Sequence, residues 1–157
     1  MKIEFQPIGV IRTPFSEPSG MPRNTAQATG IAGTVELEAR YAPGLRDLEG
    51  FSHIVLLFHF HRSDGYELEV TPPGETVAHG LFATRSPRRP NGIGLSIVRL
   101  DRIEGSVLHI ADVDMIDGTP LLDIKPYLPS VNPGGAIRTG WLGPSRSGDS
   151  DTDSGSR

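Results

Sequence analysis

Proline and glycine interrupt this chain so often that long helices are excluded and short strands joined by turns are favoured. The 157 residues include 19 glycines and 14 prolines, and no helical apolar period runs for more than about ten residues. Alternating apolar residues instead predict strands over residues 5–12, 31–38, 52–61, 66–71, 78–84, 94–103 and 106–114. The sequence therefore predicts a mainly β protein, a compact antiparallel β-barrel with one or two short helical turns.

The strongest predicted strand is Ser52–His61, in which apolar side chains alternate along the whole length. We expect one face to carry Ile54, Leu56, Phe58 and Phe60, and the other to carry Val55, Leu57, His59 and His61. A short helical turn is expected around Leu45 and Leu48, with Gly50 as its end. Glu104-Gly105 is expected to form a tight turn between the last two strands.

The composition indicates one globular domain of a cytoplasmic protein. Hydrophobic residues make up 36% of the chain and charged residues 22%, which is typical of a folded domain. No apolar run is long enough for a membrane span, and the N-terminus does not resemble a signal peptide. The absence of cysteine excludes disulfides, a thiolate nucleophile and cysteine-bound zinc. The net charge of −4 argues against a protein coated in positive charge, although it allows a local basic patch.

The domain boundary is expected near residue 142. From Gly143 to Arg157 the chain holds no aliphatic or aromatic residue. Such a segment cannot bury enough apolar surface to offset the entropy lost on ordering. We therefore predict a barrel domain over residues 1–142 and a disordered polar tail over residues 143–157.

The first segment whose side chains could bind a ligand is Phe82–Ser96. It contains Arg85, Arg88 and Arg89 between a strand and a glycine-rich turn. Two prolines stiffen this loop, and arginine binds carboxylate or phosphate through two parallel hydrogen bonds. The pattern equally fits a solvated basic loop. Gly92-Ile93-Gly94 is not a dinucleotide fingerprint, because position 97 is isoleucine and a strand follows. A nucleotide cofactor would therefore bind outside the Rossmann framework.

The second segment is Asp112–Tyr127. Asp112 and Asp114 are expected on one strand face, and Asp117–Pro120 reads as a strong turn. On the following extended stretch, the alternation puts three side chains on one side, namely Asp123, Lys125 and Tyr127. A carboxylate, an ammonium group and an aromatic ring could orient a reacting amine. The same residues also fit a purely structural interpretation. In that case Asp117 only forms the turn, and Asp123 and Lys125 form a surface salt bridge.

Two histidines, His59 and His61, could bind a metal together with Asp112 or Asp114. A metal-dependent hydrolase using His59, His61 and Asp114 is one function considered on this basis. Two histidines without a third ligand at a recognisable spacing favour packed or hydrogen-bonded side chains instead. No metal is predicted.

Several stretches together resemble the TsaA-like family, whose best-known activity is that of tRNA methyltransferase O. The resemblance covers about residues 5–130 and rests on the stretches Pro7–Ile11, Gly20–Asn24, Leu48–His53, Leu57–His61, Phe82–Ser96 and Asp117–Tyr127. It implies a β-barrel, a homodimer and S-adenosyl-L-methionine (SAM) bound without a Rossmann fold. It also implies N6-methylation of N6-threonylcarbamoyladenosine, the modified base beside the anticodon of tRNA.

By motif position, the resemblance assigns the cofactor contacts to Pro22, Arg23, Asn24, His61, Arg62, Arg85, Leu95, Asp117, Gly118, Thr119 and Pro120. Our hypothesis for catalysis is that Asp123 accepts from the reacting N–H, Tyr127 packs on the base and Lys125 lies near a phosphate or the substrate carboxylate. Arg88 and Arg89 are expected to contact RNA.

This chain departs from the family pattern in two respects. It is expected to be a short form without the additional C-terminal domain of longer members, and Asn24 stands where the pattern has glutamine. Two alternatives stay open at this point: a SAM-dependent methyltransferase of another RNA or small substrate, and a SAM- or RNA-binding module without catalysis.

Overall fold

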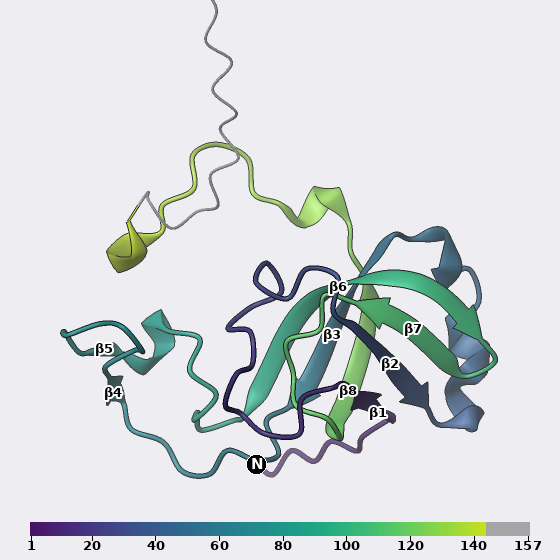
Figure 1. Ribbon diagram of the computed structural model, residues 1–157, viewed down its shortest axis with the longest axis horizontal. Helices are drawn as coiled ribbons and strands as arrows, with labels where there is room; N and C mark the ends of the chain where they lie inside the picture. Colours follow the sequence, from purple (N-terminus) through teal and green to yellow (C-terminus); the bar gives the residue numbers. More distant parts are fainter. Residues whose placement is uncertain (144–157) are drawn as a thin grey trace, which may run out of the picture. The chain divides into compact units, whose positions relative to one another are not determined.

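The computed structural model describes residues 1–143 and contains a closed six-stranded antiparallel barrel (Figure 1). Around the barrel the strand order is β1-β2-β7-β6-β3-β8. The bounds are β1 (Gly9–Arg12), β2 (Ala32–Leu37), β3 (His53–His59), β6 (Ile93–Glu104), β7 (Val107–Ala111) and β8 (Thr119–Pro126). The predicted mainly β barrel is confirmed.

Short 3-10 turns connect the strands. Residues Met1–Tyr127 form one compact unit, which holds η1 (Ala39–Leu45), η2 (Leu48–Gly50) and η3 (Leu81–Ala83). The turns at Leu45 and Leu48 were expected, and both leucines are buried. A second unit begins at Leu128, and its described part holds η4 (Pro129–Val131) and η5 (Gly140–Leu142). Residues 144–157, most of the predicted disordered tail, lie outside the described residues.

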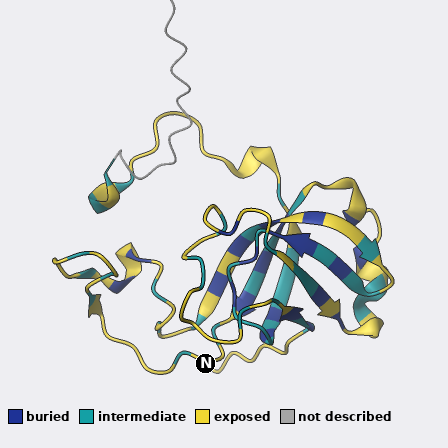
Figure 2. Ribbon diagram, viewed as in Figure 1, coloured by how far each residue is buried: buried dark blue, intermediate teal, exposed yellow. Residues whose placement is uncertain are grey.

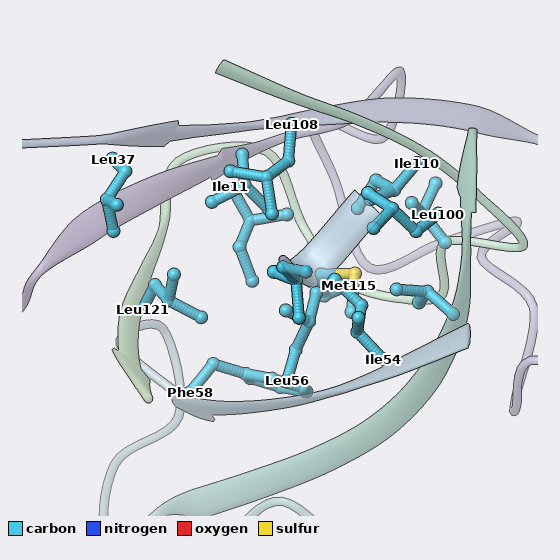
Figure 3. Close-up of a cluster of buried hydrophobic side chains, with 14 of the residues drawn as sticks. Ile11, Leu37, Ile54, Leu56, Phe58, Leu100, Leu108, Ile110, Met115 and Leu121 are labelled. Carbon is cyan, nitrogen blue, oxygen red and sulfur yellow. The ribbon is translucent and has the colours of Figure 1, made fainter. Parts of the chain in front are cut away.

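The barrel core is built from the inward faces of all six strands. Burial alternates along β3, where Ile54, Leu56 and Phe58 are buried and the residues between them are half-buried (Figure 2). Val113 and Met115, from the connection between β7 and β8, join the same core. Figure 3 shows Met115 among the buried side chains of the strands. The other buried members are Ile11, Val35, Leu37, Leu45, Leu48, Val98, Leu100, Leu108, Ile110 and Leu121. Burying these apolar side chains is the main favourable contribution to folding.

Several predicted strands are shorter in the structure. The first begins at Gly9 rather than at residue 5, and the strands expected over 66–71 and 78–84 reduce to β4 (Glu69–Val70) and β5 (His79–Gly80). β4 and β5 pair only with each other, so no neighbouring barrel strand extends them. β7 ends at Ala111 because Asp112 has a φ of 69°, a left-handed conformation that stops an extended ladder.

β8 begins inside the predicted turn Asp117–Pro120, and only the stretch from Asp123 to Tyr127 was expected to be extended. In the structure Pro120 pairs with Val10 of β1, one residue after the strand begins. Proline is tolerated near the start of a strand because few ladder hydrogen bonds are lost there. The predicted tight turn after Glu104 is confirmed: Glu104 pairs with Val107, and Gly105 has a φ of 61°.

Among residues 1–143, no helix has both the length and the apolar character needed to cross a membrane.

Replacing Gly94 with alanine tests the closest approach between β3 and β6. Gly94 lies opposite Phe58 in the register, and a Cβ atom at this position would overlap the Phe58 ring. We expect Gly94→Ala to lower the free energy of unfolding by about 1–3 kcal/mol, because overpacking forces a core ring to move. Gly80→Ala is the matched control, since nothing lies within 4 Å of an added Cβ atom there. Chemical denaturation measures both, and equal stabilities would contradict the packing argument.

Candidate functional site

A pocket of about 400 Å³ opens at the end of the barrel where β3 ends and β6 and β8 begin. Its volume lies within the range of small-molecule sites in proteins. Five separate parts of the chain line it: Pro18, Met21, Pro22 and Arg23; Phe58, Phe60, His61, Arg62 and Ser63; Arg85 and Pro87; Leu95 and Ser96; Asp114, Met115, Ile116 and Thr119.

The early loop contributes Pro22 and Arg23 to the pocket and is ordered by its own side chains. The Arg23 backbone N–H donates to the Gln27 side-chain oxygen at 3.0 Å, and the Gln27 N–H donates to the Asn24 side-chain oxygen at 3.0 Å. The backbone N–H of Gly30 donates to Asp112 at 2.7 Å, which ties the loop to the end of β7. Asn24, a predicted cofactor contact, is therefore a loop-ordering residue and does not line the pocket.

His61 and Arg62 line the pocket directly after β3. Arg62 donates to the Ser16 backbone oxygen at 2.7 Å and lies 3.5 Å from the Glu17 carboxylate. Partial burial lowers the pKa of His61, and the neighbouring charges of His59 and Arg62 lower it further. His61 is therefore largely neutral at neutral pH.

The two histidines of the predicted strand do not share a face. β3 ends at His59, and a tight turn joins the His61 N–H to the His59 backbone oxygen at 2.8 Å. The His59 ring bonds the Gly92 backbone oxygen at 3.1 Å, whereas His61 lines the pocket. In residues 1–143 no group of three or more histidine or acidic residues is arranged to hold a metal.

The three arginines of the first segment have different positions: one lines the pocket, and the other two bond backbone oxygens. Arg85 lines the pocket and donates to the Leu95 backbone oxygen at 3.1 Å. Arg88 donates to the Asp64 backbone oxygen at 3.0 Å, and Arg89 donates to the backbone oxygens of Thr84 and Ser86. Neither Arg88 nor Arg89 lines the pocket, and both hold the loop in shape.

The turn Asp117–Pro120 fastens the barrel end more than it lines the pocket. An Asp117 carboxylate oxygen accepts from the Thr13 N–H at 3.1 Å, and the Gly118 N–H donates to the Ile11 backbone oxygen at 2.9 Å. Gly118 adopts a φ of 82°, which favours glycine. Of the four residues predicted to contact the cofactor, only Thr119 lines the pocket.

Asp114 is the lining residue whose role the sequence analysis missed. It was expected to share a strand face with Asp112, but the left-handed conformation of Asp112 separates the two side chains. Asp112 holds Gly30, whereas Asp114 accepts a hydrogen bond from the Ser96 hydroxyl at 2.7 Å in the pocket wall. Burial raises the pKa of Asp114, although the Ser96 hydrogen bond opposes that shift. The sequence pattern did contain one indication of this pair. Ser96 is a polar residue at an inward position of an alternating strand, where it needs a hydrogen-bond partner.

The three predicted catalytic residues lie on β8 and just after it, outside the pocket lining. The Lys125 ammonium group lies 2.8 Å from the Asp123 carboxylate; the Lys125 side chain is exposed and Asp123 is half-buried. The Tyr127 N–H donates to the His53 backbone oxygen at 3.1 Å, which continues the β3–β8 pairing. In the strand register, Asp123 lies opposite Leu57, which lies opposite Leu95. Asp123 instead lines a separate cavity, together with Ile8, Leu37 and Leu48.

Comparison with known proteins identifies the family. The model of the tRNA-methyltransferase O N-terminal domain matches residues 10–132. The chain belongs to this family. The resemblance found in the sequence is therefore confirmed, and the pocket at the barrel end is a pocket of a tRNA-methyltransferase O N-terminal domain.

Relatives and solved structures agree with this membership. The chain is 49% identical to a probable S-adenosyl-L-methionine-binding protein of Pyrococcus abyssi over 142 residues, covering 90% of this chain and 77% of the relative. It is 42% identical to the tRNA (adenine(37)-N6)-methyltransferase of Escherichia coli, covering 80% of this chain and 58% of that enzyme. A crystal structure of TrmO from Pseudomonas aeruginosa superposes with a TM-score of 0.75 at 39% identity, covering 90% of this chain and 63% of that one. The chain thus spans less than two thirds of the last two.

Replacing Asp114 with asparagine should stabilise the protein in the absence of a ligand. Because burial raises the folded-state pKa of Asp114 above its unfolded value, folding disfavours the ionised form. The stabilising contribution is present at acidic pH and is lost as pH rises through the folded-state pKa. We expect Asp114→Asn to raise the melting temperature at pH 7 by a few degrees, about 2–4 °C for each kcal/mol gained.

Asp101→Asn is the control with the opposite sign. The Arg99 guanidinium lowers the pKa of the exposed Asp101 carboxyl, so removing its charge should slightly lower the melting temperature at pH 7. Thermal unfolding followed by circular dichroism at pH 7 and at acidic pH measures both variants. A lower melting temperature for Asp114→Asn at pH 7 would contradict the assigned origin of the pKa shift.

Proposed function

We propose that this chain is a SAM-dependent methyltransferase that acts on N6 of N6-threonylcarbamoyladenosine, next to the anticodon of tRNA. The observation that carries the proposal is the pocket itself. Residues expected to contact SAM come from four distant parts of the chain, namely Pro22-Arg23, His61-Arg62, Arg85 with Leu95, and Thr119, and they line one cavity. The similarity to the tRNA (adenine(37)-N6)-methyltransferase of Escherichia coli supports the same reaction.

The residues of the pocket fit SAM chemically. Three guanidinium groups, from Arg23, Arg62 and Arg85, can receive the cofactor carboxylate. Aromatic side chains, Phe58 and Phe60, offer an apolar wall for the adenine ring, and their own rings meet edge to face with centroids 5.5 Å apart. SAM supplies a methyl group on a positively charged sulfur. The chain supplies the orientation, which is the main requirement of an in-line displacement.

The proposed catalytic residues remain Asp123, Lys125 and Tyr127. N6 of the modified base must lose its proton when it gains a methyl group, so an acceptor near that N–H lowers the barrier. In this proposal Asp123 is the acceptor, and its ion pair with Lys125 fixes the position of the carboxylate. Tyr127 packs on the base, and Lys125 also faces the phosphate or the threonyl carboxylate of the substrate.

Arg88 and Arg89 are the proposed RNA contacts. Arg88 donates to the backbone oxygen of Asp64 and Arg89 to those of Thr84 and Ser86, and carbonyl groups do not neutralise the charge of either arginine. Both therefore add positive potential beside the pocket, where a phosphate backbone would pass. The tRNA substrate also leads us to propose a cytoplasmic location.

A homodimer is part of the proposal. On the outer face of β6, Ile93 and Leu95 are 45% and 46% exposed, which is high for apolar side chains of a strand that is paired on both sides. Val55 and Leu57 of β3 continue this face. A second copy packed here would cover an exposed apolar patch. It would also close one side of the pocket, because Leu95 both lies on this face and lines the pocket.

The proposed activity is tested by mass spectrometry of tRNA nucleosides from cells with and without the gene. We expect the methylated threonylcarbamoyl nucleoside to disappear without the gene and to return when the gene is restored.

In vitro, purified protein should gain thermal stability with SAM, because ligand binding stabilises the folded state. Arg85→Ala should weaken SAM binding about tenfold, as expected for a lost charge-assisted hydrogen bond.

Arg102→Ala is the matched control for Arg85→Ala. Arg102 forms an exposed ion pair with Glu104 at the far end of β6, so its removal should leave SAM affinity unchanged. An unchanged nucleoside profile together with SAM binding would reject the substrate and support a SAM-binding module or another substrate. No stabilisation by SAM would reject the proposal as a whole.

The homodimer is tested by introducing a charge on the outer face of β6. We expect Ile93→Glu to shift the protein from dimer to monomer, because an isolated carboxylate is costly in an apolar interface. Light scattering coupled to size-exclusion chromatography gives the mass directly. Ile137→Glu, at a residue that is 62% exposed and lies outside the family match, should leave the dimer intact. A monomeric wild-type protein at all concentrations would contradict the proposed dimer.

A further inference from the structure

Positively charged side chains outnumber negatively charged ones in the pocket lining. Arg23, Arg62 and Arg85 contribute three positive charges. Among the described residues that line the pocket, Asp114 is the single acidic side chain. Arg62 is partly offset by Glu17 at 3.5 Å, a residue outside the lining. A positively charged ligand group entering this pocket thus meets one carboxylate among several cations.

The Asp114 carboxylate is fixed in the wall by the residues around it. Its two chain neighbours, Val113 and Met115, are buried in the barrel core, which fixes the backbone on both sides. The Ser96 hydroxyl, itself on an inward position of β6, donates to one carboxylate oxygen at 2.7 Å. The buried β7–β8 connection and β6 therefore aim this carboxylate together, and no rearrangement is needed before a ligand arrives.

We propose that Asp114, positioned by Ser96, is the anionic contact for the positively charged part of the cofactor and a determinant of the preference for SAM. The inference rests on the proposed function, because it takes SAM as the ligand of this pocket. It adds a residue that the motif comparison did not assign to the cofactor.

The charge of SAM explains why such a contact is needed. SAM carries one carboxylate and two cations, the α-ammonium group and the sulfonium, so its net charge is positive. The guanidinium groups that receive the carboxylate repel both cations at short range. A carboxylate fixed on the pocket wall offsets this repulsion, and its hydrogen bonds to a cation are about twice as strong as neutral ones.

The protonation behaviour of Asp114 is consistent with this role. Burial raises the pKa of Asp114, so ionisation in the empty pocket is disfavoured although Arg85 partly compensates. A cation bound beside the carboxylate would favour the ionised form again. The stability lost by burying the charge is then recovered only when a positively charged ligand is present.

Isothermal titration calorimetry of the full chain with three nucleosides tests the proposal. SAM carries both cations, S-adenosylhomocysteine carries only the ammonium group, and 5′-methylthioadenosine carries neither. We expect Asp114→Asn to weaken SAM binding about tenfold, the effect of one charge-assisted hydrogen bond, and to leave 5′-methylthioadenosine within about twofold. Asparagine has the same shape and can still bond Ser96, so circular dichroism should show an unchanged fold.

Two further variants locate the origin of any loss. Ser96→Ala keeps the carboxylate and removes its positioning hydrogen bond, so it should give a smaller loss with the same order among the three nucleosides. Asp101→Asn removes one negative charge at an exposed site outside the pocket, and it should change none of the three affinities.

Each outcome has one meaning. A larger loss for SAM than for S-adenosylhomocysteine supports a contact with the sulfonium, and an equal loss for these two with 5′-methylthioadenosine unaffected supports a contact with the ammonium group. No loss, or the same loss for all three nucleosides, overturns the role of Asp114 and leaves the proposed function standing. A wild-type protein that binds none of the three overturns the proposed function together with the inference.

Discussion

Closure of the barrel between β1 and β8 is the constraint on which the other features depend. The two strands share three residue pairs, Gly9 to Leu121, Val10 to Pro120 and Ile11 to Thr119. This pairing brings the connection between β7 and β8 against the end of β1, where the Asp117 carboxylate and the Met115 backbone oxygen hold Thr13. Val113 and Met115 can then fill the barrel end from inside. The pocket wall is a consequence of this closure.

The same connection joins stability to function. Val113 and Met115 are buried in the core, whereas Asp114 between them lines the pocket and carries a charge that burial disfavours. A protein selected only for stability would place a neutral side chain there. A raised pKa beside a fixed hydroxyl partner is more often found where a ligand or a reaction uses the carboxylate. The neighbouring Asp112 has a structural role, because its carboxylate accepts from the Gly30 N–H and so anchors the early loop.

The sequence predicted the elements of this fold better than their limits. The alternation of β3 and the glycine turn after β6 are local patterns, and both were predicted correctly. The end of β7 at Asp112 and the start of β8 at Thr119 were not, because they depend on which strand lies alongside. In the site, the arginines of the first segment were recognised as a group. Only the fold separates Arg85, which lines the pocket, from Arg88 and Arg89, which hold the loop.

The sequence by itself determined that this chain forms a barrel of short strands and that it belongs to a SAM-related family. Periodicity, turn residues and motif spacing are properties of neighbouring residues, so they can be read without coordinates. The tertiary structure decided that Asp114 and Ser96, 18 positions apart, meet at 2.7 Å in the same pocket as Arg85. It also decided that His59 and His61 turn to different surroundings. Both outcomes follow from long-range strand pairing, which brings together residues that no local pattern relates.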